Sequence, residues 1–299
     1  MDRMRYLYMQ MCKFVRQGGW IWKLLSFIYI IKSDKKCNKL KLLKKNKSLK
    51  NIHKGERCFV LGNGPSLNNL DFSLLENEQV FTVNCLMVDE RYKLLKPNYH
   101  FWMDYNGFGL RDDVKGDASK SAELMKMLED YENLLFFVPA QAYPVIRQYG
   151  VDQNIDMRYL DMIDYGHIHK IDISTVSLGF STVVQYAIET AIYMGFKEIY
   201  LLGCDTTIIK SVIDVALGQE VSTVHAYQED EEKSQEDAYK QVLKNNGVKF
   251  VLEDTLSVIK GYEELDRYCD KNDIKLVNLS DITLIDCIKR DRIENVLKQ

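Results

Sequence analysis

Residues 58–67 read Cys58-Phe59-Val60-Leu61-Gly62-Asn63-Gly64-Pro65-Ser66-Leu67, and this stretch decides the fold. An apolar run that ends in Gly-Asn-Gly-Pro-Ser is typical of a β-strand that leads through a tight loop into a helix. Gly62 and Gly64 allow positive φ and have no Cβ to block a ligand, and Pro65 suits a first helical turn. The N–H groups of that turn would face the carboxyl edge of an α/β sheet, where anionic ligands bind. The loop therefore predicts a nucleotide-phosphate site, with an ordinary strand-to-helix turn as the alternative.

Two better-known phosphate motifs are excluded. The dinucleotide fingerprint needs a third glycine where this chain has Leu67. A P-loop needs Gly-Lys-Ser or Gly-Lys-Thr, and neither follows. The loop by itself therefore does not identify the nucleotide.

Size and composition indicate one large globular α/β domain. The chain has 299 residues, of which 46% are hydrophobic and 28% charged, enough to bury a full core. Its formal net charge of −3 gives no sign of nucleic-acid binding. Seven cysteines without a Cys-x-x-Cys spacing indicate buried thiols in a reducing, cytoplasmic compartment, and no zinc site. We expect the domain over residues 53–299 and an N-terminal appendage over residues 1–52.

The N-terminal appendage combines an apolar run with a basic one. Residues 20–31 are apolar and aromatic but too short to cross a bilayer, which takes about 20 residues. Between Lys32 and Lys50 there are nine lysines and a single acid, Asp34. Such a pair of features suits a helix lying on an anionic membrane, and a helix packed on the core is the alternative. We expect a protein bound peripherally to the inner face of the cell membrane.

Apolar runs alternate with helical patterns along most of the chain. Strands are predicted at residues 58–61, 79–84, 99–104, 134–138, 198–205 and 275–279. Helices are predicted at residues 68–76, 89–95, 117–132, 182–194, 229–246 and 257–272. This alternation indicates a doubly wound, mostly parallel, Rossmann-like sheet. Residues 206–228 have the composition of a lid over its edge.

Polar residues follow four of the predicted strands. Asn63, Asn84, Asp104 and Asp205 each lie at or just past the carboxyl end of a strand. Each of them alone is also a common turn former. Because the carboxyl ends of parallel strands share one edge, we expect the four side chains to converge on one ligand cleft.

Three segments together resemble a known family. Residues 59–67, 83–84 and 195–205 are similar to the bacterial sialyltransferases of glycosyltransferase family 42. They are also similar to a wider bacterial group that includes the 6-hydroxymethylpterin pyrophosphokinase-like proteins. The similarity covers about residues 55–285 and is thin between the motifs. It implies a modified Rossmann-like, GT-A-like transferase that uses a CMP-activated sugar and needs no metal.

The resemblance also assigns roles to individual residues. It implies a donor site made of Gly62, Asn63, Gly64, Ser66, Asn84, Asp104, Ser181, Thr182 and Asp205. Within this set, Asn63, Gly64 and Ser66 would hold the nucleotide phosphate and ribose, and Asn84 would contact the phosphate or base side. Asp104 stands where the family has an asparagine, and a carboxylate there would repel another anion.

The family's catalytic histidine follows its Gly-x-Asp strand after a flexible lid, and in this chain only His225 takes that place. Histidine suits a general base because its ordinary pKa lies near neutrality, and a solvated surface histidine is the alternative. The family's tyrosines, which are thought to support the leaving phosphate, are absent after Asp205. Lys210 or Tyr227 would have to replace them.

Three functions compete. The first is a metal-independent glycosyltransferase that adds a sialic-acid-like sugar from a CMP donor to a lipid-linked or bacterial surface glycan, with His225 as base. The absence of any Asp-x-Asp motif disfavours the transferases that hold Mg²⁺ or Mn²⁺ in it. The second is a Mg²⁺-dependent pyrophosphokinase of the 6-hydroxymethylpterin type, with Asp104 and Asp205 as metal ligands. The third is a nucleotide-binding scaffold without catalysis, and a homo-oligomer stays open for all three.

Overall fold

The centre of the molecule is one eight-stranded sheet in which every neighbouring pair of strands is parallel. The computed structural model describes residues 20–33, 38–110, 117–163, 167–219, 226 and 232–298. The strands are β1 (Arg57–Leu61), β2 (Gln79–Val83), β3 (Tyr99–Phe101), β4 (Leu135–Pro139), β5 (Asp156–Ile163), β6 (Val176–Leu178), β7 (Glu198–Leu202) and β8 (Lys275–Asn278). Their order is β6-β5-β4-β3-β2-β1-β7-β8, so the chain winds outward from β1 in both directions. The predicted doubly wound parallel sheet is confirmed.

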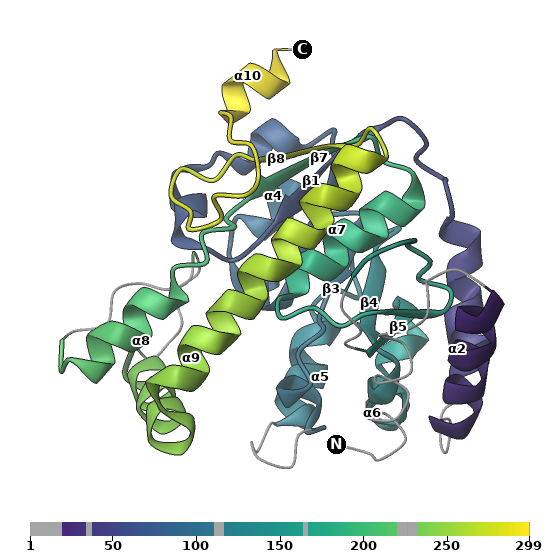
Figure 1. The fold of residues 1–299 in the computed structure, drawn as a ribbon, viewed down its shortest axis with the longest axis horizontal. Helices are drawn as coiled ribbons and strands as arrows, with labels where there is room; N and C mark the ends of the chain where they lie inside the picture. The colour runs from purple at the N-terminus through teal and green to yellow at the C-terminus, as the bar shows by residue number, and fades with distance from the viewer. Residues whose placement is uncertain are drawn as a thin grey trace.

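Helices cover both faces of this sheet (Figure 1). They are α2 (Trp20–Ser33), α3 (Lys39–Lys44), α4 (Tyr92–Leu95), α5 (Ala118–Lys126), α6 (Tyr143–Tyr149), α7 (Val183–Met194), α8 (Ile208–Ala216), α9 (Glu232–Lys271) and α10 (Ile293–Leu297). Because side chains alternate along a strand, β1 sends Cys58 and Val60 into a core shared with α2, α7 and α9. Phe59 and Leu61 enter a second core shared with α4, α5, α6 and α10. Both faces of β1 are therefore buried, which explains its unbroken apolar run.

Strands β5 and β6 extend the sheet beyond β4 and were not predicted. The apolar pattern of β5 is interrupted by Asp161, whose side chain is fully buried. The ammonium of Lys39 lies 3.3 Å from both carboxylate oxygens of Asp161, and the Gln141 amide donates to one of them at 2.7 Å. A buried charge is tolerated when it is paired in this way. The compensating lysine is 122 residues away, so no local pattern reveals the strand.

Several predicted helices have different bounds. The segment predicted over residues 68–76 forms two short 3₁₀ turns, Pro65–Asn69 and Phe72–Leu75. The two helices predicted over residues 229–246 and 257–272 are both present within α9, which is kinked between them at Gly247 (φ 74°, ψ 171°). The second helix begins directly after this glycine and so starts earlier than predicted. The predicted lid contains α8, while residues 220–225 and 227–231 lie outside the described part of the chain.

The described part of the N-terminal appendage packs on the domain. Ser26, Tyr29 and Ile30 of α2 are buried, and so are Leu42 and Leu43 of α3. In Figure 1, α2 stands at the side of the sheet where β5 lies. Among the described helices, none has both the length and the apolar character needed to cross a membrane.

Candidate functional site

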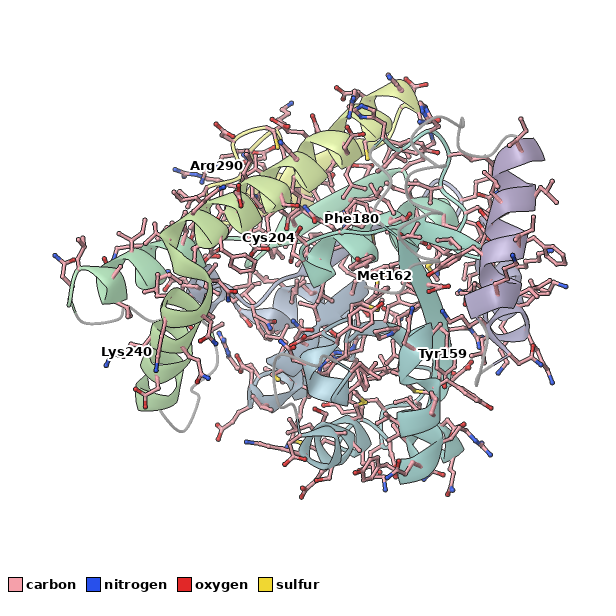
Figure 2. All side chains as sticks on the ribbon, turned by 60° about the horizontal axis from the view of Figure 1, so that its bottom comes forward. Tyr159, Met162, Phe180, Cys204, Lys240 and Arg290 are labelled. Carbon is pink, nitrogen blue, oxygen red and sulfur yellow. The ribbon has the colours of Figure 1, made fainter. Side chains whose placement is uncertain are left out.

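The sheet changes winding direction between β1 and β7. Strands β2 to β6 continue on one side of β1, and β7 and β8 lie on the other. Ligands of open α/β sheets bind outside the carboxyl ends of the strands at such a switch point. A cavity of about 950 Å³ lies here, bounded by the loops after β1, β2, β3 and β7 and by the start of α7. Figure 2 shows three of its lining residues, Met162, Phe180 and Cys204, which come from widely separated parts of the chain.

The four strand-end residues do converge. Asn63, Asn84, Asp104 and Asp205 all line this one cavity, which confirms the expectation drawn from their positions. The cavity is also lined by Gly62, Gly64, Ser181 and Thr182. Of the nine residues of the implied donor site, Ser66 alone is not among the lining residues.

Ser66 instead binds Asp205. The Asp205 carboxylate accepts a hydrogen bond from the Ser66 backbone N–H at 2.8 Å and a second one from the Ser66 hydroxyl. Asp205 is buried, and burial raises its pKa, an effect that the two bonds from Ser66 oppose. The N–H groups of Gly62, Gly64 and Leu67 donate to protein carbonyls. A carboxylate therefore occupies the place where the sequence predicted a phosphate.

Gly62 and Gly64 are required for a different reason than expected. Neither has positive φ; Gly64 has φ −66°. A Cβ on Gly62 would lie 2.4 Å from the carbonyl oxygen of Gly203, and one on Gly64 would lie 2.4 Å from Cγ of Asp205. The glycines let the loops after β1 and β7 touch each other. Gly203, directly after β7, is the glycine of these two loops that has positive φ (62°).

Two residues with side chains adopt left-handed backbone at the cavity. Asn84 has φ 47° directly after β2, and Thr206 has φ 57° after Asp205. Asparagine tolerates this region, whereas a β-branched threonine is strained in it. The Oδ1 atom of Asn84 is buried and has no hydrogen-bond partner among the described residues. Strained residues of this kind gather at ligand sites, because a surrounding structure must hold them there.

The first turn of α7 faces the cavity. Residues 182–184 line it, and Thr182 at the N-cap position makes no side-chain bond to the helix. The Ser181 hydroxyl donates to the hydroxyl of Ser257 on α9 at 2.8 Å. The N-terminus of a helix carries partial positive charge, so this end of the cavity favours an anion.

Asp104 stabilises the turn in which it lies. Its carboxylate is exposed and accepts a hydrogen bond from the backbone N–H of Asn106 at 2.8 Å. This is the turn-forming role that the sequence left open as the alternative. Asp104 still lines the cavity, so it also contributes negative charge at the β3 side.

The candidate base and leaving-group residues are only partly described. His225 and Tyr227 lie outside the described residues. Ala226, between them in the sequence, donates its backbone N–H to the carbonyl oxygen of Asn63 at 2.9 Å. Lys210 lies on α8, forms an ion pair with Asp214 at 2.6 Å, and is not among the described residues that line the cavity.

Gln141 is a cavity residue that sequence reasoning missed. It follows β4, and its amide is held between the Asp161 carboxylate at 2.7 Å and the Tyr105 hydroxyl, which donates to it at 3.3 Å. The rule that found the other strand-end residues would also have found Gln141, as the first polar residue after β4. Asp254 and Tyr262 on α9 line the cavity as well, and no local signal marks them.

No group of three or more His, Cys, Asp or Glu side chains that could hold a metal ion occurs within the described residues.

Comparisons with known proteins give a distant structural likeness. No family model matches the chain, and no curated protein matches it. Among solved structures, it is similar to the sialyltransferase CstII from Campylobacter jejuni in complex with a substrate analogue, cytidine-5'-monophosphate. The two are 19% identical over 79% of this chain and 85% of that one, with a TM-score of 0.43.

Proposed function

We propose that this chain is a glycosyltransferase whose CMP-activated donor sugar binds in the cavity between the ends of β1 and β7. The observation that carries the proposal is the position of this cavity, at the switch point of an all-parallel sheet and lined by strand-end amides and hydroxyls. Its volume of about 950 Å³ suits a nucleotide joined to a sugar. The sequence resemblance described above selects CMP among the nucleotides.

The donor phosphate is proposed to lie at the start of α7. The loop after β1 is a poor alternative, because its Ser66 donors are already bound to the negative Asp205. The α7 end offers N–H groups, the Thr182 hydroxyl and partial positive charge. The base and ribose then lie toward Asn63 and Asn84, whose amides can both donate and accept hydrogen bonds.

The proposed reaction is a direct displacement. The acceptor hydroxyl oxygen bonds to the anomeric carbon while the bond from that carbon to the phosphate oxygen breaks. CMP leaves with the bonding electrons, and the acceptor proton passes to His225 as general base. Support for His225 is its place in the sequence and the bond that its neighbour Ala226 makes to the cavity residue Asn63. Lys210 and Tyr227 remain candidates for stabilising the leaving phosphate.

The proposed reaction uses no metal, as expected from the missing Asp-x-Asp sequence. The pyrophosphokinase alternative would require Asp104 and Asp205 as ligands of Mg²⁺. Asp205 is instead buried and bound by Ser66, and Asp104 holds its own turn. No observation favours that alternative.

A thermal-shift series tests the nucleotide. CMP, UMP, AMP, GMP and ATP are added singly, each with Mg²⁺ or with EDTA. CMP is expected to raise the melting temperature equally in both, because a ligand that binds only the folded state stabilises it by about 2.7 kcal/mol at a hundredfold excess over its Kd. Asn84→Ala should lose most of the shift, while Asn295→Ala, which removes an amide on α10 that is not among the cavity-lining residues, should keep it. A shift with ATP and Mg²⁺ alone would overturn the proposal.

Turnover is tested separately. CMP release from a CMP-activated sialic acid is followed with a panel of glycan acceptors, in the presence of EDTA. His225→Ala should bind CMP as the unchanged protein does but lose roughly 10²–10⁴-fold in rate, the usual contribution of a general base. Equal rates for the two proteins would remove His225 from the mechanism. CMP binding without release across the panel would favour the non-catalytic scaffold.

A further inference from the structure

Helix α2 presents an apolar surface on both of its sides. One side is buried against the core through Ser26, Tyr29 and Ile30. On the other side five large apolar residues are exposed, from 39% for Ile28 to 52% for Ile31; they are Ile21, Leu24, Phe27, Ile28 and Ile31. Their spacing of three and four residues puts them on one face of the helix, which we call the outer face.

The outer face is unusual for a helix on the surface of a domain. Such a helix normally buries one apolar stripe and turns polar residues to water. Here one apolar stripe already packs against the core, and the outer face adds a second apolar stripe whose side chains are in contact with water. Contiguous exposed apolar surface marks a site of interaction.

The residues that follow indicate the charge of the partner. Between residues 32 and 50 six lysines are exposed; they are Lys32, Lys41, Lys44, Lys45, Lys47 and Lys50. Asp34 is the one acid between residues 32 and 50. A second copy of this chain docked through the same face would bring two basic clusters together, and like charges across an interface oppose association. An anionic partner is favoured instead.

We propose that the outer face of α2 docks on the surface of an anionic lipid bilayer. The apolar side chains enter the boundary between headgroups and acyl chains, to a depth of about 5–10 Å. The lysines are held near acidic headgroups. The helix lies along the surface and does not cross it. This proposal does not depend on the proposed function, since it concerns another part of the molecule.

Vesicle flotation tests the proposal. The full chain is mixed with vesicles of phosphatidylcholine alone or with about 30% phosphatidylglycerol, at low and at high salt. We expect binding to the anionic vesicles only, and weaker binding at high salt, because salt screens the lysines. The triple variant Leu24→Gln, Ile28→Gln, Ile31→Gln should bind at least about tenfold more weakly, since it removes the apolar contact.

Two further proteins control the experiment. Leu94→Gln, Ile282→Gln, Leu284→Gln removes three comparably exposed apolar side chains elsewhere and should bind as the unchanged chain does. Lys44→Gln, Lys45→Gln, Lys47→Gln leaves α2 intact and should lose binding to anionic vesicles, which keeps the test valid if the α2 variant fails to fold. The same samples are measured by size-exclusion chromatography with light scattering.

Three results would overturn the proposal. One is equal binding of the outer-face variant and its control. Another is binding that ignores phosphatidylglycerol content. The third is no binding to either kind of vesicle. If, in that case, the chain is a dimer that the outer-face variant converts to a monomer, the partner of the outer face is a second copy of the chain.

Discussion

Asp205 determines how the loop after β1 is used. From the sequence, Asp205 and the 62–66 loop are both candidates to contact a ligand, one as an acceptor and the other through its N–H groups. In the structure they contact each other, through the two bonds between Ser66 and Asp205. The pair fixes the loop against β7, and this is the reason for proposing that the donor phosphate lies at the start of α7.

This contact predicts strong coupling between the two residues. Asp205→Ala leaves the half-buried Ser66 donors without this partner and should lower the free energy of unfolding by about 1–3 kcal/mol. Ser66→Ala should also destabilise the protein, and the double variant should cost less than the sum of the two. Urea unfolding of the four proteins measures the coupling energy. Additive losses would show that the Ser66–Asp205 contact contributes nothing.

Glu189 on α7 makes stability depend on pH. Its side chain is 1% exposed, and burial raises its pKa to about 8. Below pH 4.5 the carboxyl is protonated in both the folded and the unfolded chain. As the pH rises toward 8, only the unfolded chain loses the proton, so the folded state loses stability by up to about 1.4 kcal/mol per pH unit.

Glu189→Gln should therefore be neutral near pH 4 and stabilising at pH 8, because the amide carries no ionisation cost. Thermal unfolding across this pH range measures the difference, which should grow with pH and level off above pH 8. Glu123→Gln, on the exposed side of α5, controls for the substitution itself. A difference between wild type and Glu189→Gln that stays constant with pH would contradict the prediction.

Among the elements, α7 and α9 pack closely at one glycine. A Cβ on Gly261 of α9 would lie 2.5 Å from Nε2 of Gln185 on α7. Gln185 is fully buried and donates to the carbonyl oxygen of Val258 at 2.7 Å, so it cannot easily move aside. The glycine is thus needed for the contact between α7 and α9, which pack on the same face of the sheet.

We predict that replacing this glycine by alanine changes the stability in the opposite direction to the usual one. Glycine inside a helix is normally about 1 kcal/mol worse than alanine, yet Gly261→Ala should destabilise this protein by about 1–3 kcal/mol through the clash with Gln185. In a Gln185→Ala background the clash is gone, and Gly261→Ala should then stabilise. Urea unfolding of the single and double variants measures both effects. Stabilisation by Gly261→Ala in both backgrounds would show that α9 shifts without cost.

The elements that could be predicted are those whose signals are local. β1, β2, β7 and α7 are apolar runs ended by glycine or a polar residue, and the structure has them within a few residues of the predicted bounds. β5 was missed because Asp161 interrupts its pattern and its partner Lys39 is remote in sequence. The convergence of Asn63 and Asn84 followed from parallel topology alone, whereas the bond between Ser66 and Asp205 depends on tertiary contact.

At the scale of the whole molecule, a chain of polar contacts joins the N-terminal appendage to the cavity. Lys39 pairs with Asp161 on β5, Asp161 accepts from Gln141, and the Tyr105 hydroxyl donates to Gln141. Gln141 and Tyr105 both line the cavity. The segment that carries the outer face of α2 is thereby linked through one buried carboxylate to the residues around the proposed donor.

This link predicts that Lys39 matters for binding although it is remote from the cavity lining. Lys39→Met leaves the fully buried Asp161 charge unpaired, which should cost about 3–5 kcal/mol of stability. It should also weaken CMP binding, because Gln141 loses its fixed orientation. Adding Asp161→Asn removes the buried charge and keeps an oxygen to accept from Gln141, so the double variant should recover most of both losses. Urea unfolding and CMP titration measure the two effects separately. If the double variant is as unstable as Lys39→Met alone, the loss of stability comes from the lost packing of the lysine and not from the unpaired carboxylate. If stability recovers while CMP binding does not, the orientation of Gln141 does not depend on this pair.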